Sequence, residues 1–234
     1  MKVMILAAGL GTRMRPLTLK TPKPLLKIAG RSLIEHHIVR LREAGFRELV
    51  INHAWLGEQI EQHLGTGKQL GVSIQYSAES EPLETAGGIV KALPLLSPGG
   101  EDPFAVINGD IFCTYPYQQL PVCSEALAHL VLVPNPEHNK AGDFLLSKGR
   151  VLSQEQSLSD TPAYTFSGIS VLSPALFEGL GPGEKAALAP LLRRAICDGK
   201  VTGELYEGYW VDVGTPQRLE DVDVFVKENL NNEF

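Results

Sequence analysis

The sequence has little cysteine and no long hydrophobic run. Its three cysteines, Cys113, Cys123 and Cys197, are odd in number and show no C-x-x-C spacing. This pattern argues against a disulfide framework and a zinc ribbon, and it favours a reducing, cytoplasmic environment. No apolar stretch approaches the roughly 20 residues that a membrane-spanning helix needs, and the N-terminal apolar run is too short for a signal peptide. We therefore expect no membrane partner.

Positive charge is also scarce over the chain as a whole. The 234 residues include 21 Lys and Arg against 27 Asp and Glu, which gives a net charge of −6. Because nucleic-acid binding requires an excess of basic residues, this balance argues against a general nucleic-acid partner. A hydrophobic fraction of 44% and a mean hydropathy near zero are typical of a globular protein, and the length suits one large domain.

Short apolar runs alternate with helical patterns in the first half of the chain. The expected elements, strand and helix in turn, cover residues 3–7, 33–44, 48–52, 56–64, 73–76, 86–93 and 104–108. Repeated βα units predict a doubly wound, mostly parallel sheet. In the second half we expect strands at 129–133, 144–147 and 164–172 and helices at 188–198 and 216–227. We interpret that half as antiparallel additions to the same sheet, followed by a tail at 228–234.

The strongest functional signal is the loop at residues 6–27, which follows the first strand directly. A loop of this length inside a βα unit is commonly functional. Gly9 and Gly11 lack side chains, so backbone N–H groups can approach an anion closely. The loop also concentrates positive charge in an acidic protein, which indicates a polyanionic ligand such as a triphosphate. The basic residues are Arg13, Arg15, Lys20, Lys23 and Lys27.

Two common phosphate-binding motifs do not fit this loop. The dinucleotide fingerprint G-x-G-x-x-G requires glycine at position 14, where this chain has Met14. The P-loop pattern G-x-x-x-x-G-K-[ST] does not occur in the sequence either. The loop therefore predicts neither a dehydrogenase nor a P-loop NTPase.

A third pattern does fit. Residues 9–24 read G-L-G-T-R-M-R-P-L-T-L-K-T-P-K-P, which resembles the signature of the sugar-1-phosphate nucleotidyltransferases. The resemblance continues through residues 52–57, 108–110 and 210–215 and so extends over essentially the whole chain. It implies a Rossmann-like α/β fold of the nucleotide-diphospho-sugar transferase type. It also implies one domain over residues 1–227, with a nucleotide-binding half at about 1–112 and a sugar-binding half at about 113–227.

The resemblance implies roles for the residues of the loop. Part of the loop would wrap the triphosphate, and Lys23 would contact phosphate oxygens at the reacting centre. Attack of one phosphate on another brings anions together, so catalysis of this kind depends on positioning and on fixed positive charge. The residues expected at the triphosphate are Gly9, Gly11, Thr12 and Arg13. The catalytic candidates are Arg13, Lys23 and Asp110.

Two carboxylates are candidates for a metal site. Asp110 follows the apolar run at 104–107, and ligands of open α/β sheets bind beyond the carboxyl ends of the strands. Asp212 lies between apolar residues, where an unpaired carboxylate is costly to bury. Two carboxylates with phosphate oxygens and water suit Mg²⁺, and the resemblance matches both acids to the family's magnesium pair. The six histidines form no H-x-x-x-H pair, so we expect them to be structural or surface groups.

Residues 79–88 resemble the family's base-binding loop, which runs into a helix. Glu79 is expected to accept a hydrogen bond from a ring N–H of the base, with Thr85 and Gly88 also at the nucleotide. A helix N-terminus near Gly87 and Gly88 would favour close approach of the ligand. Relatives often carry glycine where this chain has Glu84, so the chain departs from the family there. The alternative interpretation is a polar loop that only caps the helix.

The sugar site is implied by the resemblance alone. Gly142 corresponds to the edge of the hexose pocket, and Asp143 lies beside it in sequence. Asn108 is expected to contact the sugar phosphate. The chain lacks the E-K-P-type acidic segment that many relatives carry before the strand at 164–172, and Glu155 is the candidate to replace it.

The implied reaction is Mg²⁺-dependent transfer of a uridylyl group from UTP to N-acetylmuramate α-1-phosphate. The products would be UDP-N-acetylmuramate and pyrophosphate, in cytoplasmic recycling of peptidoglycan. Thymidylyl or guanylyl transfer to a glucose- or mannose-type 1-phosphate stays open, as does a non-catalytic sensor of nucleotide sugars. Arg13, Lys23, Asp110 and Asp212 are all present, which favours an enzyme over a sensor.

Overall fold

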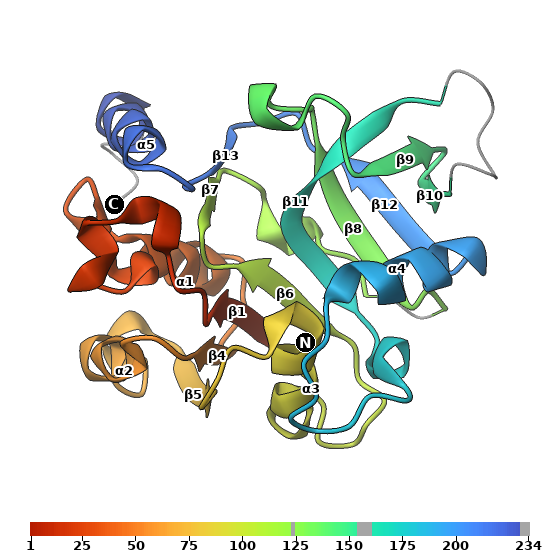
Figure 1. Ribbon diagram of the computed structural model, residues 1–234, viewed down its shortest axis with the longest axis horizontal. Coiled ribbons are helices and arrows are strands. Elements are labelled where there is room, and N and C mark those ends of the chain that lie inside the picture. Colours follow the sequence, from red (N-terminus) through yellow and green to blue (C-terminus); the bar gives the residue numbers. More distant parts are fainter. Residues whose placement is uncertain (123–124, 154–160, 230–234) are drawn as a thin grey trace.

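The computed structural model describes residues 1–122, 125–153 and 161–229. Its centre is a nine-stranded mixed sheet in the order β5-β4-β1-β6-β11-β8-β12-β10-β9, with helices on both faces (Figure 1). The strands are β1 (Val3–Ala7), β4 (Glu48–His53), β5 (Ser73–Ala78), β6 (Phe104–Asn108), β8 (Ala128–Val133), β9 (Phe144–Ser147), β10 (Arg150–Leu152), β11 (Ala163–Leu172) and β12 (Val201–Leu205). This architecture confirms the predicted α/β class.

The N-terminal half of the sheet is parallel, as expected from its βα units. β5, β4, β1 and β6 pair in parallel register. Val3 and Ile5 of β1 are buried on the face covered by α1 and α2, whereas Met4 is buried on the opposite face beneath α3. Because β1 is covered on both faces, its sequence is continuously apolar. The helices of this half are α1 (Leu33–Glu43), α2 (Gly57–Leu64) and α3 (Glu84–Leu96).

The C-terminal half extends the sheet from β6. β11 pairs antiparallel with β6 and β8, and β10 pairs antiparallel with β9 and β12. β12 pairs in parallel with β8, so the prediction that this half adds antiparallel strands is wrong for β12. The chain enters β12 from α4 (Leu188–Cys197), which packs on the same face as α3, and a parallel pair requires a crossover of this kind.

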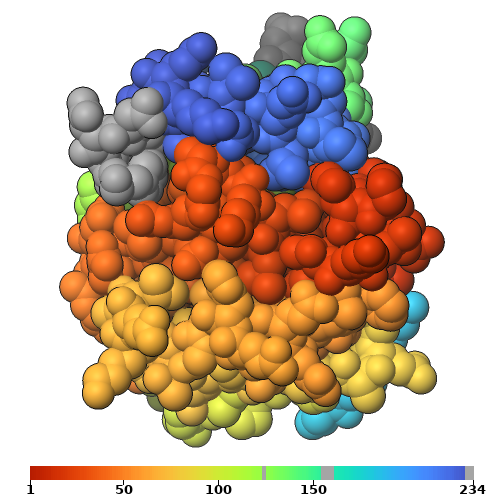
Figure 2. Space-filling model, turned by 90° about the vertical axis from the view of Figure 1, so that its left-hand side faces the viewer, coloured from red at the N-terminus to blue at the C-terminus, as the bar shows by residue number. Residues whose placement is uncertain are grey.

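Two short ribbons lie outside the main sheet, and the last helix packs on them. In the core that they share, Val222 and Val226 of the last helix are buried with Ile28, Phe112 and Val213. The N-terminal loop, red in Figure 2, therefore lies beside the blue C-terminal segments. The elements are the ribbons β2 (Lys27–Ile28) with β3 (Arg31–Ser32) and β7 (Ile111–Cys113) with β13 (Trp210–Asp212), and the helix α5 (Pro216–Asn229).

Most predicted elements match the structure to within a few residues. β6 and β9 have the predicted bounds, and α1 ends one residue earlier than predicted, at Glu43. The strands β2, β3, β7, β10 and β12 were not predicted, because they are short or interrupted by glycine, as at Gly203. Within the described ranges, no helix is long and apolar enough to cross a membrane.

Candidate active site

A cleft of about 470 Å³ opens where β1 and β6 end. This volume suits a small-molecule ligand, and the carboxyl ends of parallel strands are where ligands of open α/β sheets bind. The walls come from the N-terminal loop, the segment that leads into α3 and the turn between β6 and β7. Nine predicted residues line it together: Gly9, Gly11, Thr12, Arg13, Lys23, Glu79, Thr85, Asn108 and Asp110.

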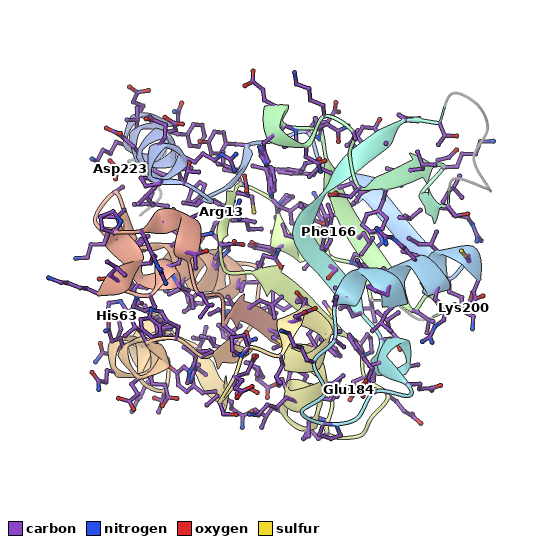
Figure 3. The ribbon with its side chains drawn as sticks, viewed as in Figure 1. Arg13, His63, Phe166, Glu184, Lys200 and Asp223 are labelled. Atoms are coloured by element: carbon purple, nitrogen blue, oxygen red, sulfur yellow. The ribbon has the colours of Figure 1, made fainter. Side chains whose placement is uncertain are left out.

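The N-terminal loop is held in tight turns. Gly11 has φ +60°, a left-handed conformation that favours glycine. Its carbonyl accepts hydrogen bonds from the Thr18 hydroxyl at 2.7 Å and from the Met14 N–H at 3.0 Å. Met14 is fully buried, so it anchors the turn where a dinucleotide-binding loop would have glycine. Arg13, labelled in Figure 3, is exposed and lines the cleft.

Lys23 and Asp110 form an ion pair inside the cleft. Lys23 lies between Pro22 and Pro24 and is the first residue of a short 3₁₀ turn. Asp110 lies in the turn that follows β6. The Lys23 Nζ to Asp110 Oδ2 distance is 2.8 Å. The Lys23 side chain is only 10% exposed, whereas that of Asp110 is 42% exposed. The amine is therefore held in place while the carboxylate stays accessible to a ligand.

The β7–β13 ribbon brings the two predicted metal ligands together. Asp212 pairs with Ile111 across the ribbon, and the Val213 N–H donates to the Asp110 carbonyl at 2.7 Å. The two acids thus stand on adjacent backbones although they are far apart in sequence. No group of three or more His, Cys, Asp or Glu side chains within the described ranges could hold a metal. Two carboxylates fit Mg²⁺, which usually takes its remaining oxygens from substrate and water.

Two basic side chains that were not predicted contact Asp212. Arg218, in the first turn of α5, donates from Nη1 to Asp212 Oδ1, and His138 Nε2 lies 3.3 Å from the same oxygen. A Cβ at Gly214 would lie 3.3 Å from Nη1 of both Arg13 and Arg218. Positive charge therefore converges on this acid. No sequence pattern links His138 to Asp212. Arg218 could have been proposed as a partner, because only a short loop separates Asp212 from the start of α5.

The part of the cleft that was predicted to bind the base contains Glu79 and Thr85, with Gly88 behind Glu79. Glu79 is 6% exposed, and its two carboxylate oxygens accept hydrogen bonds from Asn52 Nδ2 and the Leu83 N–H. Gly88 packs against Glu79, since a Cβ there would lie 2.6 Å from Glu79 Oε1. Gly88 thus supports the wall of the cleft from within α3.

Part of the α3 N-terminus has a different use from the one predicted. The N–H groups of Ala86 and Gly87 both donate to the Ala186 carbonyl, at 2.9 and 3.1 Å. A Cβ at Gly87 would lie 2.3 Å from the Glu184 carbonyl oxygen. These first-turn donors therefore attach the helix to the loop that precedes α4. Glu84 and Thr85 are the residues of this turn that line the cleft.

The predicted sugar residues are divided between two places. Asn108 lines the main cleft, but Gly142 and Asp143 line a second cavity of about 430 Å³. Asp143 accepts hydrogen bonds from Asn139 Nδ2 at 3.0 Å and from the Phe166 N–H at 2.8 Å, so both of its oxygens hold the loop against β11. Glu155 lies outside the described residues.

The sequence profile of the nucleotidyl transferase family matches residues 2–229. The chain belongs to this family. It is 49% identical to N-acetylmuramate alpha-1-phosphate uridylyltransferase of Neisseria meningitidis, over 94% of this chain and 96% of that protein. It is 33% identical to the protein of the same name from Caulobacter vibrioides, over 92% of each. It is also 30% identical to mannose-1-phosphate guanylyltransferase catalytic subunit beta of Drosophila melanogaster, over 92% of this chain but 60% of that longer protein.

Solved structures confirm the nucleotidyltransferase fold. A Bacillus anthracis protein provisionally described as a glucose-1-phosphate thymidylyltransferase superposes with a TM-score of 0.82, over 97% of this chain and 95% of that one. HddC from Yersinia pseudotuberculosis, complexed with GMP-PN, superposes with a TM-score of 0.74 over 96% and 98%. Each is 21% identical to this nucleotidyltransferase, so these two likenesses establish the shared fold.

Beneath the turn at Asp110, the nucleotidyltransferase has a buried layer of polar side chains. The Tyr117 hydroxyl lies 3.3 Å from His37 Nδ1 and 3.5 Å from Cys113 Sγ. Burial lowers the pKa of His37 to about 4 and raises the pKa of the Cys113 thiol. These groups are therefore uncharged near neutral pH and support the site from below.

Proposed function

We propose that this nucleotidyltransferase transfers a uridylyl group from UTP to N-acetylmuramate α-1-phosphate, forming UDP-N-acetylmuramate and pyrophosphate. The observation that carries the proposal is the 49% identity to a protein named for that activity, over nearly all of both chains. The cleft supports it with a glycine-rich loop, the Lys23–Asp110 ion pair and an adjacent second acid, Asp212.

On this proposal the N-terminal loop binds the triphosphate. Its backbone N–H groups face the phosphate oxygens, and the Arg13 guanidinium and the Lys23 amine supply positive charge. The residues assigned to the phosphates are Gly9, Gly11, Thr12, Arg13 and Lys23. The residues assigned to the base are Glu79, Thr85 and Gly88.

Asp110 and Asp212 are the residues assigned to a Mg²⁺ ion. Their backbones are joined by a hydrogen bond, and both side chains are partly exposed, at 42% and 23%. Such a pair suits a hard cation that also takes phosphate oxygens. When bound, the ion lowers the repulsion between the two anionic substrates. Lys23 and Arg218 bring further positive charge to the same place.

The reaction needs positioning more than proton transfer. An oxygen of the sugar phosphate attacks the α-phosphorus of UTP, the bond from that phosphorus to the bridging oxygen breaks, and pyrophosphate leaves. The attacking oxygen already carries negative charge near neutral pH, so no side chain has to remove a proton from it. Arg13 and Lys23 stabilise the charge that develops on the phosphoryl oxygens and the leaving group.

The sugar-binding half is proposed to comprise residues 113–227, and the nucleotide-binding half residues 1–112. Asn108, Gly142 and Asp143 are assigned to the sugar phosphate, together with Glu155. UTP and a cell-wall sugar phosphate are cytoplasmic metabolites, so we place the enzyme in the cytoplasm and in peptidoglycan recycling.

A second candidate is guanylyl transfer to mannose 1-phosphate, which the 30% identity to mannose-1-phosphate guanylyltransferases favours. Pyrophosphate release separates the two. Each nucleoside triphosphate is combined with N-acetylmuramate, N-acetylglucosamine, glucose or mannose α-1-phosphate in Mg²⁺ buffer. We expect the highest kcat/KM for UTP with N-acetylmuramate α-1-phosphate. A higher value for GTP with mannose 1-phosphate would establish the second candidate, and no release with any pair would exclude turnover.

A further inference from the structure

Two loops of the cleft are joined by a relay of hydrogen bonds through Asn52, near the end of β4. Asn52 is 3% exposed, and its Oδ1 accepts from the Ala7 N–H at 2.9 Å. Its Nδ2 donates to Glu79 Oε1 at 2.7 Å, and Glu79 Oε2 accepts from the Leu83 N–H at 3.0 Å. The relay thus runs from the start of the phosphate loop to the start of α3.

The ends of the relay fix the direction of every bond in it. A backbone N–H can only donate, so Ala7 requires the oxygen of the Asn52 amide, and the amide nitrogen must then face Glu79. The Leu83 N–H also donates. Each oxygen of Glu79 therefore receives a hydrogen from the protein, and the carboxylate can meet a ligand only as an acceptor, through its remaining lone pairs.

Packing keeps Glu79 in this arrangement. Its own N–H donates to the His53 carbonyl at 2.8 Å, and the residue is 6% exposed. Gly88 lies directly behind it, where a Cβ would be 2.6 Å from Glu79 Oε1 and 3.0 Å from Asn52 Nδ2. Both Glu79 and Asn52 line the cleft, so the accessible remainder of the carboxylate faces the ligand.

We propose that Asn52 is a positioning residue, which holds Glu79 as an acceptor-only group and thereby selects bases that carry a ring N–H donor. The inference rests on the proposed function and deepens it. Uracil, thymine and guanine offer such a donor on the edge that pairs with other bases. Cytosine and adenine offer a bare ring nitrogen there, which a carboxylate repels. The hydrogen bond from the Ala7 N–H to Asn52 also holds Asn52 and Glu79 in place relative to the phosphate loop.

Two isosteric substitutions test the relay. Asn52→Asp replaces the donor that faces Glu79 with an acceptor, and Glu79→Gln gives the base side a group that can donate. Dissociation constants for UTP and CTP are measured by calorimetry with Mg²⁺ and no sugar phosphate. We expect the wild type to prefer UTP about 100-fold and each variant about tenfold or less, the scale of one hydrogen bond to a charged group. Glu81→Gln, on an exposed residue of the same segment, should keep the wild-type ratio.

The ratio of the dissociation constants for CTP and UTP distinguishes a loss of base selection from a general loss of nucleotide binding. A merely structural role for Asn52 predicts weaker binding or lower kcat for UTP and CTP alike, so an unchanged ratio in folded Asn52→Asp overturns the proposal. If that variant does not fold, an unchanged ratio in Glu79→Gln does so. A wild type that binds UTP and CTP equally also overturns it, while leaving nucleotide binding in place. A wild type that binds no nucleotide overturns the proposed function and this inference together.

Discussion

The proposed nucleotide side and the proposed sugar side of this enzyme are built differently. On the nucleotide side, short turns and direct side-chain pairs fix the site, as in the Gly11–Thr18 bond and the Lys23–Asp110 ion pair. On the sugar side, the predicted loop is held by a network in which Asp143 bonds Asn139 and the backbone of β11. The first side therefore combines tight turns with charged side chains, whereas the second is held by hydrogen bonds that fix the shape of one loop.

This difference predicts which substitutions should affect the binding or turnover of each substrate. On the proposed function, the charged groups of the nucleotide side act on phosphates that every nucleoside triphosphate shares, so their loss should lower turnover for all substrates. Side chains of the sugar loop act through loop shape, so their loss should change sugar binding and leave nucleotide binding intact.

The largest effect should come from the two acids. Asp110→Asn and Asp212→Asn should each lower kcat/KM by about 10³-fold, because a metal ion contributes several kcal/mol of charge stabilisation. The double variant should lose little more, since ligands of one ion act as a unit. EDTA should abolish turnover and Mg²⁺ restore it, and exposed Asp102→Asn is the matched control. Additive losses in the double variant, or activity in EDTA, would contradict a shared ion.

Lys23→Ala should have the next largest effect. We expect kcat/KM to fall by about 10²–10³-fold, the scale of losing one preorganised charge-stabilising group, with a normal melting curve. Lys20→Ala removes an exposed lysine from the same loop and should change the rate less than twofold. Steady-state pyrophosphate release measures both. A loss below tenfold for Lys23→Ala would remove the amine from the reacting centre.

Asp143→Asn should change the sugar side alone. The amide cannot accept both bonds in the same way, and losing one such bond is worth about 1–2 kcal/mol. We therefore expect KM for the sugar phosphate to rise about tenfold while KM for UTP stays within twofold. Initial rates with each substrate varied in turn measure the two constants, and Asp198→Asn on the surface is the control. An equal rise in both KM values would show that the two sides are not separable.

His37 should affect stability against pH more than rate. Burial lowers its pKa from 6.5 to about 4, so the unfolded chain binds more protons than the folded one between these values. The stability that the neutral ring contributes is present above pH 6.5 and is lost as pH falls toward 4, by about 3 kcal/mol. His37→Gln should flatten the fall in denaturant midpoint between pH 7 and pH 5, and exposed His63→Gln should not. If the denaturant midpoint falls equally steeply with pH in both variants, groups other than His37 cause the acid sensitivity.

The gathering of the loop residues in one cleft could be predicted because the information for it is local. The loop from Gly9 to Lys23 carries its turns, its cations and its position after a buried strand in one continuous stretch. The structure places Gly9, Gly11, Thr12, Arg13 and Lys23 in one cleft, whereas Arg15 and Lys20 do not line it. The α/β sheet followed from periodicity for the same reason. The apolar runs of β1 and β6 are strong signals, because both strands are buried on both faces.

The remaining contacts could not be predicted because they join distant segments. His138 reaches Asp212 only after the chain has passed through β11 and β12, and Arg218 reaches it only once α5 has formed. The bond from Asn52 to Glu79 depends on the parallel register of β4 and β5. Such pairings leave no fixed spacing in the sequence.

Isotopic labelling of the sugar phosphate oxygens tests the proposed transfer of the uridylyl group directly. N-acetylmuramate α-1-phosphate labelled with ¹⁸O in its non-bridging phosphate oxygens is incubated with UTP, Mg²⁺ and the enzyme, and the products are analysed by mass spectrometry. Our account predicts that all label enters UDP-N-acetylmuramate and that pyrophosphate is unlabelled, because the broken bond joins the α-phosphorus of UTP to the leaving group. Label in pyrophosphate, or UTP consumption without a labelled nucleotide sugar, would contradict it.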